Sequence, residues 1–545
     1  MNKKLVNLTA IFLLILMLGL EITSAQQKSQ TYDEAVHILA GYSYLKERDY
    51  RWDSEHPPLT KYLAGLPLLF LNPQLDTESA MWQDADQWHY APVFLYNNTV
   101  PADTLLFWAR FPFMILSLLL GWLIFVFTRK LFNWKAGLLA LIFYVFSPNI
   151  LAHARLANSD IALAFFFLLT FYCLYNYLKK PQFKNLIFLA LAFGLCLLTK
   201  FSAPLILPLV IVLLFIKWGQ DKKAFPLQKV LLTIFVVTIV GILVVWAGYG
   251  LEMGKIADDP VVQQRVGPIA QSIPLFNSNL PAAHYFIGFF RVVFHSSFGH
   301  GTYLLGQHSN FGWWYYFPVA FLLKTPLTTI LLLITAKLVA LKWLIKKRKA
   351  DFKKIPLRYF ILIIPPLFYF LYSMTSNLNL GLRHVLLIYP FIFILIGSMI
   401  NWPLLKKRLW PIVLMILFAF YLFSSVNIFP HYLAYFNEAV GGPKNGPKYL
   451  LDSNLDWGQD LIGLKNYMME NNFEKVYLDY AGTALPEYYF EHQPIPGPEV
   501  AESEDFSGLI AISVGYLYGA ADDFSWLKKY QPVARVGYSI YLYKF

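Results

Sequence analysis

Many of the side chains that could do chemistry fall in one stretch near the N-terminus, residues 31–61. It reads TYDEAVHILAGYSYLKERDYRWDSEHPPLTK, in a chain of 545 residues of which only 14% are charged. Adjacent carboxylates such as Asp33 and Glu34 suit general-base or metal chemistry, and holding them at a bilayer surface is costly. The double proline after His56 cannot lie inside a helix and favours the start of a new helix at Leu59. The sequence therefore predicts an active site in this stretch.

Four cationic side chains elsewhere could hold a phosphate beside these carboxylates. They are Arg110, Lys200, Arg383 and His384, and each lies near one end of an apolar run. Arginine binds phosphate through two parallel hydrogen bonds and is expensive inside a membrane without a partner. The alternatives are an ion pair with a loop acid for Arg110 and a side chain that reaches to the interface for Lys200.

Asp160 begins another apolar run, in the segment HARLANSDIALA. A carboxylate at this position is ordinary in the first turn of a helix, where it faces the positive end of the helix dipole. The other interpretation makes Asp160 a member of the active site.

The apolar runs that carry these residues predict a polytopic α-helical membrane protein. The chain is 57% hydrophobic and 18% aromatic, with a mean hydropathy of +0.47. A soluble protein of this length carries far more charge, and runs of roughly 20 apolar residues match the bilayer core. We expect about eleven spans, near residues 5–23, 103–128, 136–153, 160–178, 185–199, 202–217, 228–249, 316–345, 357–374, 383–402 and 410–428. The first could instead be a cleavable signal peptide; we favour a retained span.

The net charge of +12 does not indicate nucleic-acid binding, because the basic residues fall in short clusters between the apolar runs. With eleven spans these clusters share one side with Lys3 and Lys4, which the positive-inside rule makes cytoplasmic. They lie in residues 129–135, 179–184, 222–229, 346–354 and 406–408. Loops 24–102 and 250–315, together with the tail, then face outward.

The chain divides into a transmembrane part, residues 1–428, and a tail, residues 429–545. Strand-like runs at 475–482, 508–515 and 535–545 and a helix-like run at 455–470 predict a small extracytoplasmic α/β domain. In loop 250–315 the GWWYY segment suits an interfacial aromatic belt or a platform for a sugar or prenyl chain.

No metal site is predicted from the spacing of possible ligands. The two cysteines, Cys173 and Cys196, lie inside apolar runs, and DSNLDWG lacks the glutamate that completes a calcium loop. A divalent cation such as Mg²⁺ or Mn²⁺ near Glu55, His56 and the Asp33-Glu34 pair stays an open alternative.

Several motifs together resemble the glycosyltransferase C superfamily. The resemblance is strongest to the protein O-mannosyltransferase family (glycosyltransferase family 39) and to the related lipid A aminoarabinose transferases. It rests on DE-x-x-H, EHPPL-x-K, the turn ending in Asp160, and LTK at 198–200. Segments 299–326, 379–391, 429–443 and 452–461 also look like this group, so that the resemblance covers nearly the whole chain.

The resemblance implies many spans, a first outer loop folded over the site, and a sugar donor linked to polyprenyl phosphate. It also implies inversion at the anomeric carbon. By motif, Asp33 and Glu34 would serve the acceptor and catalysis, with Asp160 beside them, and Arg110 would hold the donor phosphate. The residues that map by motif onto positions lining the same cavity are His56, Asp160, Lys200 and Arg383. Loop 250–315 is too short for the lumenal MIR domain of fungal and animal mannosyltransferases.

We therefore predict a plasma-membrane glycosyltransferase that moves a sugar, with mannose favoured, from polyprenyl phosphate to a hydroxyl acceptor on the outer face. The acceptor would be a protein serine or threonine or an envelope glycolipid. The alternatives are aminoarabinose transfer onto lipid A and, in another class, a transporter of lipid-linked sugars. A transporter should carry polar residues at the midplane, broken helices and internal repeats; here the ionisable residues cluster on one predicted face.

Overall fold

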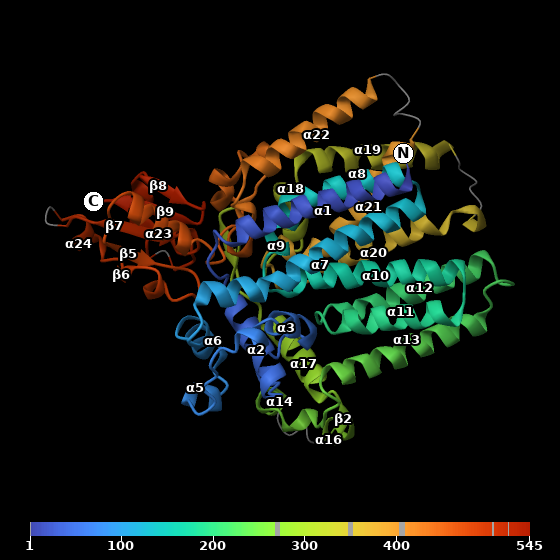
Figure 1. Ribbon diagram of the computed structural model, residues 1–545, viewed down its shortest axis with the longest axis horizontal. Helices are drawn as coiled ribbons and strands as arrows, with labels where there is room; N and C mark the ends of the chain where they lie inside the picture. The colour runs from blue at the N-terminus through green and yellow to red at the C-terminus, as the bar shows by residue number, and fades with distance from the viewer. Residues whose placement is uncertain (1, 267–272, 347–351, 403–408, 504–505, 522) are drawn as a thin grey trace.

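The computed structural model describes residues 2–266, 273–346, 352–402, 409–503, 506–521 and 523–545. Figure 1 shows a bundle of long helices running roughly side by side, with the C-terminal sheet at one end and the N-terminus at the other. Residues 347–351 of the basic cluster expected at 346–354, and the whole cluster expected at 406–408, lie outside the described residues.

The bundle consists of apolar helices long enough to cross a membrane. Seven single stretches within the described residues meet that test. They are α1 (Lys3–Ala25), α7 (Ala102–Leu131), α10 (Ser159–Lys179), η1 (Ala203–Leu205) with α12 (Ile206–Gln220), α13 (Leu227–Gly248), η4 (Leu382–Ile388) with α21 (Tyr389–Ser398) and η5 (Met399–Asn401), and α22 (Trp410–Asn427).

Two further spans are bent pairs of helices. In α8 (Trp134–Val145) with α9 (Pro148–Ala154) the bend is 66°, and in α18 (Tyr316–Lys324) with α19 (Leu327–Lys346) it is 115°. A proline follows each break, where its ring prevents the helix from continuing. The shorter apolar helices α11 (Phe183–Leu197) and α20 (Leu357–Ser373) complete the bundle. Each of the eleven predicted spans thus coincides with one of these stretches, and the protein is a multi-pass integral membrane protein.

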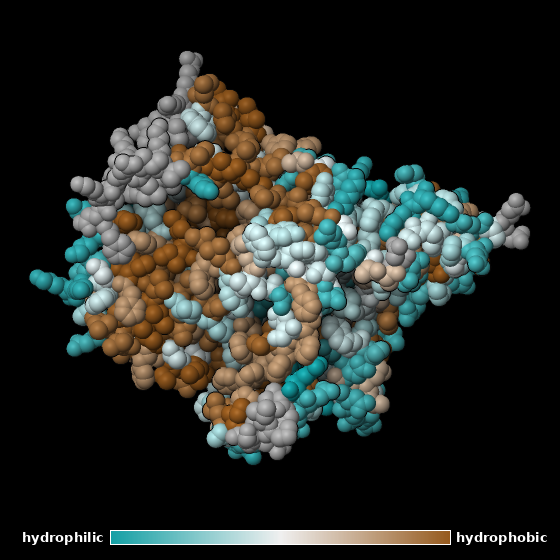
Figure 2. Space-filling model, turned by 180° about the vertical axis from the view of Figure 1, so that it is seen from behind, coloured by the Kyte–Doolittle hydropathy of each residue, from teal (hydrophilic) through white to brown (hydrophobic). Residues whose placement is uncertain are grey.

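The outward surface of the bundle is apolar. Figure 2 shows a broad hydrophobic face over the bundle and a mostly hydrophilic C-terminal domain. Large side chains such as Phe12, Phe235 and Met415 are well exposed on helices α1, α13 and α22. Such a face is stable against lipid and unstable against water.

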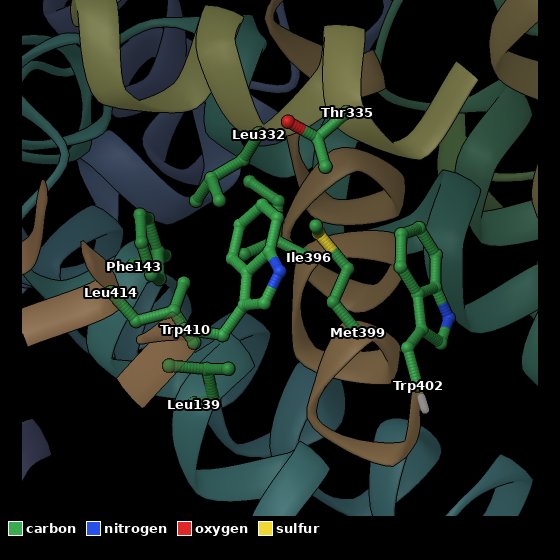
Figure 3. Close-up of a pocket in the computed structure, with 9 residues that line it drawn as sticks. All are labelled: Leu139, Phe143, Leu332, Thr335, Ile396, Met399, Trp402, Trp410 and Leu414. Carbon is green, nitrogen blue, oxygen red and sulfur yellow. The ribbon is translucent and has the colours of Figure 1, made fainter. Parts of the chain in front are cut away.

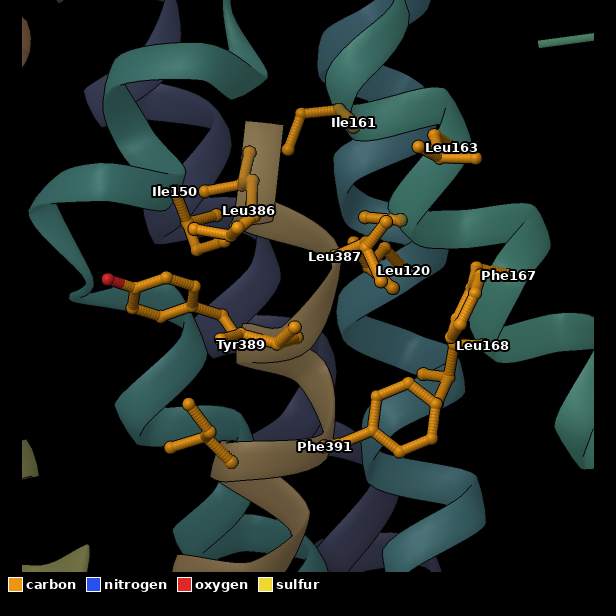
Figure 4. Packing of buried hydrophobic residues seen from close by; sticks show 14 of the residues in the cluster. Leu120, Ile150, Ile161, Leu163, Phe167, Leu168, Leu386, Leu387, Tyr389 and Phe391 are labelled. Carbon is orange, nitrogen blue, oxygen red and sulfur yellow. The ribbon is translucent and has the colours of Figure 1, made fainter. Parts of the chain in front are cut away.

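The core of the bundle lies around α21. Nine of its ten residues are buried, and Figure 4 shows Tyr389 and Phe391 packed among side chains of neighbouring helices such as Ile150 and Phe167. Gly397 lets α21 approach α8, because a Cβ there would lie 2.4 Å from the carbonyl oxygen of Ala136. This packing fixes the start of η4, where Arg383 lies.

Loop 26–101 folds into short helices beside one end of the bundle. They are α2 (Glu34–Lys46), α3 (Pro58–Gly65), α4 (Leu68–Leu71), α5 (Ala80–Gln83) and α6 (Gln87–Tyr96). Helix α3 begins one residue before the predicted start. Helices α2 and α3 cross in backbone contact at Gly41 and Gly65, since a Cβ on Gly41 would lie 1.9 Å from the carbonyl oxygen of Lys61.

The second long loop, between α13 and α18, carries short helices and two small hairpins. They are β1 (Met253–Gly254), η2 (Ile256–Asp258), α14 (Pro260–Val266), α16 (Pro274–Asn277), β2 (Leu280–Pro281), α17 (Ala283–Phe298), β3 (Thr302–Leu304) and β4 (Gln307–Ser309). Strand β1 pairs with β2, and β3 pairs with β4, both antiparallel.

The tail forms a five-stranded mixed sheet in the order β6-β5-β7-β9-β8. Its elements are α23 (Leu461–Glu470), β5 (Lys475–Asp479), β6 (Glu491–Gln493), α24 (Pro498–Ala501), β7 (Leu509–Ser513), α25 (Val514–Leu517), β8 (Ala534–Val536) and β9 (Ile540–Lys544). Strand β5 is parallel to β6 and β7, whereas β9 is antiparallel to β7 and β8.

Residues 429–460 connect the last span to this sheet and run across the ends of the bundle helices. The buried amine of Lys324, at the end of α18, donates to the carbonyl oxygens of Leu433 and Asn454. The short helix η10 (Asp452–Asn454) follows this route. The connection therefore packs as part of the membrane domain, and the sheet itself is built from residues after 461.

Candidate active site

Four side chains from distant parts of the sequence meet at one place: the carboxylates of Asp33 and Asp160 and the cations of Lys200 and Arg383. Arg383, in the first turn of η4, lies at the centre of the group. Its Nη2 lies 3.4 Å from Oδ2 of Asp33, and its Nη1 lies 3.9 Å from Oδ2 of Asp160. On the other side, Nζ of Lys200 donates to Oδ1 of Asp160 at 2.8 Å. These four residues form one connected group, which we call the Arg383 cluster.

Local structure explains how the two carboxylates differ. Asp33 takes the N-cap position of α2, but its side chain makes no capping hydrogen bond and is 23% exposed. Asp160 lies in the first turn of α10, behind the capping side chain of Asn158, and only 1% of its side chain is exposed. Asp33 is thus the carboxylate that a molecule entering from outside can reach, and Asp160 is the one that neutralises the cations.

The tail supplies further contacts to Arg383. Its Nε donates to Oγ of Ser453 at 3.2 Å, and its guanidinium lies 4.2 Å from the centre of the Trp457 ring. An arginine stacked on an indole is held in one plane with its remaining N–H groups directed sideways. Neither Ser453 nor Trp457 is among the predicted site residues, although segment 452–461 is one of those that resemble the glycosyltransferase group.

Two buried atoms of the predicted site residues have no hydrogen-bond partner among the described residues. They are Oδ2 of Asp160 and Nε2 of His384, the residue after Arg383. Unpaired buried polar atoms are rare in folded proteins and costly to keep. Beside a cationic cluster they mark positions where a ligand can supply the missing contacts.

Asp452 adds a third carboxyl group near the cluster. Burial raises the pKa of Asp452 above its ordinary value, and the nearby Arg383 and the backbone N–H of Ser453 offset only part of this effect. Its φ of +58° places it in the left-handed region, which is uncommon for residues other than glycine. The density of polar residues after an apolar span is the sequence signal that could have found it.

Glu34 and Arg110 are placed differently from the Arg383 cluster, because they are buried against each other. Nε and Nη2 of Arg110 donate to the two carboxylate oxygens of Glu34 at 2.8 and 2.7 Å. The other N–H groups of the guanidinium donate to the backbone carbonyl oxygens of Ala25, Lys28 and Ser29. All five guanidinium donors are thus used, which corresponds to the ion-pair alternative for Arg110.

The carboxylate of Glu34 is equally occupied. Besides Arg110 it accepts hydrogen bonds from the backbone N–H and hydroxyl of Thr31 and from the backbone N–H of Ala157. Burial acts to raise the pKa of Glu34, but the charge and hydrogen bonds of Arg110 outweigh it and hold that pKa below its ordinary value. Glu34 therefore fastens the loop to α7 and does not offer a lone pair to a substrate.

His56 lies in a separate group of the first outer loop. Its Nδ1 is 3.0 Å from Oδ1 of Asp53, and Nδ1 of His37 is 2.6 Å from Oδ2 of the same carboxylate. The two imidazole rings meet edge to face with centroids 4.8 Å apart. The predicted site residues therefore fall into three groups. The first is the Arg383 cluster with His384, the second is the Glu34–Arg110 pair, and the third is His56 with Asp53 and His37.

Residues near the N-terminus and the tail also hold each other at this end of the bundle. The backbone N–H of Ser29 donates to the carbonyl of Gln459, and that of Tyr32 donates to the carbonyl of Trp457. Nζ of Lys28 forms a buried ion pair with Asp460. These contacts, which we call the tail clasp, position Asp33 next to Trp457 and Arg383.

Two hollows lie outside the Arg383 cluster. One, of about 420 Å³, lies between the start of α7 and α23, and Arg110, Asp103 and Lys465 are among its lining residues. The other is a small apolar pocket of about 20 Å³ between α8, α19, α21 and α22. Figure 3 shows Phe143, Met399 and Trp410 turned into the apolar pocket, which has no charged side chain in its lining.

A family model for dolichyl-phosphate-mannose-protein mannosyltransferases matches residues 102–246 of the chain. The match confirms the resemblance over that part of the sequence and supports a glycosyltransferase as the class of enzyme. It contains Arg110, Asp160 and Lys200. No curated protein matches the sequence.

Among solved structures, the chain is similar to the ArnT of Cupriavidus metallidurans bound to undecaprenyl phosphate. That similarity has a TM-score of 0.48 and 11% sequence identity and covers 98% of this chain and 97% of the other. It is also similar to the archaeal oligosaccharyltransferase AglB of Archaeoglobus fulgidus in complex with an inhibitory peptide and a dolichol-phosphate. There the TM-score is 0.45 and the identity 12%, over 96% of this chain and 72% of the other. Both are distant similarities.

Proposed function

We propose that the protein is an integral-membrane glycosyltransferase that moves a sugar from a polyprenyl phosphate to a hydroxyl acceptor. The observation that carries the proposal is the Arg383 cluster, in which one reachable carboxylate, Asp33, lies beside Arg383, and a buried carboxylate, Asp160, holds Lys200 and lies near Arg383. The mannosyltransferase family match over residues 102–246 supports the same class of reaction.

In the proposed reaction the oxygen of the acceptor hydroxyl attacks the anomeric carbon of the sugar, and Asp33 takes the proton from that hydroxyl. A positioned general base contributes about 10²–10⁴-fold to such a step. A single displacement from the face opposite the phosphate inverts the anomeric centre. We assign this role to Asp33 and not to Glu34, because the Glu34 carboxylate accepts hydrogen bonds from Arg110, Thr31 and Ala157.

Arg383 and Lys200 stabilise the phosphate that departs with the lipid. Charge develops on the phosphate oxygens as the glycosidic bond breaks, and cations fixed in a water-poor site stabilise it without reorganising. Asp160 bonds Lys200 and lies near Arg383, so both cations keep their positions between substrates. This assignment gives Arg383 the role first suggested for Arg110.

Mannose is the sugar we propose, and a protein serine or threonine or an envelope glycolipid is the acceptor.

We place the enzyme in the plasma membrane with the Arg383 cluster on the outer face. Helix α1 begins, and α7 and α10 end, at the side of the bundle opposite the sheet in Figure 1, and Lys3, Arg129 and Lys179 lie at these ends. Basic residues at one end support a cytoplasmic N-terminus.

The test is transfer of labelled mannose from polyprenyl-phosphate-mannose by the full chain in membranes. Peptide and glycolipid acceptors are compared, with and without chelator, because a requirement for Mg²⁺ or Mn²⁺ stays a prediction. Arg383→Gln is the inactive control and should insert normally. Product on peptide supports protein mannosylation, and product only on lipid supports envelope modification. Transfer from another prenyl-linked sugar, but not from polyprenyl-phosphate-mannose, would contradict the choice of mannose. Movement of the donor across the membrane without any transfer product would contradict the proposal that the protein is an enzyme.

A further inference from the structure

Three potential metal ligands converge in the first outer loop, beside the Arg383 cluster. His37 lies on α2, and Asp53 and His56 lie on the turn before α3. One nitrogen from each imidazole and the Asp53 carboxylate all lie within 4.8 Å of one another. His37 and Asp53 are buried, and 24% of the His56 side chain is exposed. The residues are too far apart in sequence to form a recognisable ligand motif, which is why no site was predicted there.

The surrounding structure holds the three ligands in place independently of one another. The contact of α2 with α3 at Gly41 and Gly65 fixes the distance between the helix that carries His37 and the turn that carries Asp53. The backbone N–H of Asp53 donates to Oε1 of Gln87 at 2.8 Å. Ligands held by backbone contacts of this kind need little reorganisation to bind an ion.

Lys61 holds the turn that carries Asp53 and His56 mainly through backbone contacts. Its amine donates to the backbone carbonyl oxygens of Asp53 and His56 and, at 2.9 Å, to the hydroxyl of Tyr44. An ammonium group has three donors, and these contacts use all of them. The amine also forms a buried ion pair with Oδ2 of Asp53 at 3.4 Å. Each of the two carboxylate oxygens lies within 3.0 Å of one imidazole nitrogen.

We propose that His37, Asp53 and His56 form a binding site for a transition-metal ion, with Zn²⁺ the best match. Two imidazoles with one carboxylate suit zinc, whereas Mg²⁺ and Ca²⁺ prefer oxygen ligands alone. Ligand atoms about 2.0–2.1 Å from a tetrahedral zinc lie roughly 3.3 Å apart. The nitrogen–oxygen distances of 2.6 and 3.0 Å would therefore widen by less than about 1 Å. The exposed edge of His56 leaves room for water as a fourth ligand.

This site is distinct from a second group of side chains nearby. His295, on α17, contacts Glu55 at 3.0 Å and His300 at 3.4 Å, and all three are at least partly exposed. It also differs in its ligands from the Mg²⁺ or Mn²⁺ alternative left open above, which places the ion near Glu55, His56 and the Asp33-Glu34 pair. A metal bound by His37 and His56 would fix the turn that leads into α3.

The experiment measures zinc bound to the full chain in detergent after removal of metal with a chelator and re-addition of Zn²⁺. We expect about one tightly bound zinc per chain in the wild type. His37→Ala and His56→Ala should weaken binding more than tenfold, while His56→Cys, which replaces an imidazole by a thiolate ligand, should restore it. Cobalt substitution should give the absorption of a tetrahedral site in the wild type and a shifted, thiolate-containing spectrum in His56→Cys.

Two control variants distinguish this site from other histidine–carboxylate contacts. His89→Ala removes an exposed imidazole that contacts Asp86 at 2.8 Å, and His295→Ala removes the centre of the second group. Both should retain the zinc. Loss of zinc in His295→Ala alone, equal binding by the wild type and a His37→Ala/His56→Ala double variant, or no tight zinc in the wild type would each overturn the proposal. Failure of His56→Cys to bind zinc would also count against it.

Discussion

The neighbouring carboxylates Asp33 and Glu34 have opposite surroundings, and replacing each by its amide should have opposite effects. Asp33→Asn removes the proposed base but leaves the packing, so we expect transfer to fall by about 10²–10⁴-fold with an unchanged melting temperature. Steady-state transfer and thermal unfolding of the same purified sample measure the two quantities. Transfer at the wild-type rate would contradict the assignment of Asp33.

Glu34→Gln should instead destabilise the protein, because it leaves the buried charge of Arg110 without its counter-ion. Removal of one partner of a buried ion pair costs about 3–5 kcal/mol. Because the folded-state pKa of Glu34 lies below its unfolded value of 4.5, the stabilisation is complete above pH 4.5. It is lost as the pH falls through the lower, folded-state value.

Thermal unfolding of the wild type and of Glu34→Gln between pH 3 and 7 tests this expectation. The difference between the two should be largest at neutral pH and shrink on acidification. Glu78→Gln, at an exposed position, is the control and should follow the wild type at every pH. A pH-independent difference would mean that Glu34 acts through packing and not through its charge.

Much of the Arg383 cluster could be predicted at the residue scale, because an ionisable residue at the end of an apolar run needs a reason to be there. Asp160, Lys200 and Arg383 are predicted in this way, and Asp33 is predicted from its place in the adjacent carboxylate pair. Which ionisable side chains pair with each other could not be predicted. Whether Arg110 binds Glu34 or lines a cavity depends on how α7 packs against residues 25–29. The roles of Ser453 and Trp457 depend on the path of the tail.

At the scale of elements, the contact of α2 with α3 should be intolerant of even one methyl group. A Cβ on Gly41 would overlap the backbone of α3, which cannot move as a flexible side chain could. We expect Gly41→Ala to cost about 1–3 kcal/mol or more in the free energy of unfolding and to reduce transfer. The matched control is Gly19→Ala on α1, where the added methyl meets nothing within 4 Å and should stabilise the helix slightly.

Unfolding in a mild detergent, followed by intrinsic fluorescence, compares these two variants. Equal stability of Gly41→Ala and Gly19→Ala would show that α2 and α3 can separate without cost. Their crossing would then not be what positions the first outer loop.

The spans were predictable because their apolar runs match the bilayer thickness, but their internal breaks were not. The bend between α8 and α9 and the sharp bend between α18 and α19 arise at Pro148 and Pro326. Hydropathy alone does not register such bends. A proline in a span can kink it or end it, and the neighbouring helices decide which.

The tail shows the same limit. Strands β5 and β7 and helix α23 lie within predicted segments, but the last predicted strand, 535–545, is a hairpin of β8 and β9 turned at residues 537–539. The first six residues of the predicted helix 455–470 are not helical. Asp456 accepts hydrogen bonds there from the backbone N–H groups of Gly458 and Gly515, and such local bonds compete with helix formation.

For the whole molecule, the tail clasp should couple the stability of the tail to the activity of the Arg383 cluster. Burial acts to raise the pKa of Asp460, but the charge of Lys28 outweighs it and holds that pKa low. Asp460→Asn removes the counter-ion of the buried Lys28, and we expect a loss of about 3–5 kcal/mol. Transfer should fall as well, because Trp457 and Ser453 are carried by the same segment.

Limited proteolysis of residues after 461 and transfer assays measure both effects. The matched control is Glu502→Gln, which breaks an exposed ion pair with Lys529 at 2.7 Å. It should leave stability almost unchanged, because exposed ion pairs contribute little. Increased cleavage of the tail with undiminished transfer would show that the Arg383 cluster forms without it.

The tail clasp also determines when, during its synthesis, each protein molecule can first become active. The ribosome makes Asp33 early and Ser453 and Trp457 near the end, and chains fold from the N-terminus as they emerge. A nascent chain still entering the membrane therefore has Asp33 but lacks part of the support of Arg383. Activity is thus postponed until the final span has been inserted, so an interrupted chain cannot consume the lipid-linked sugar on which the proposed reaction depends.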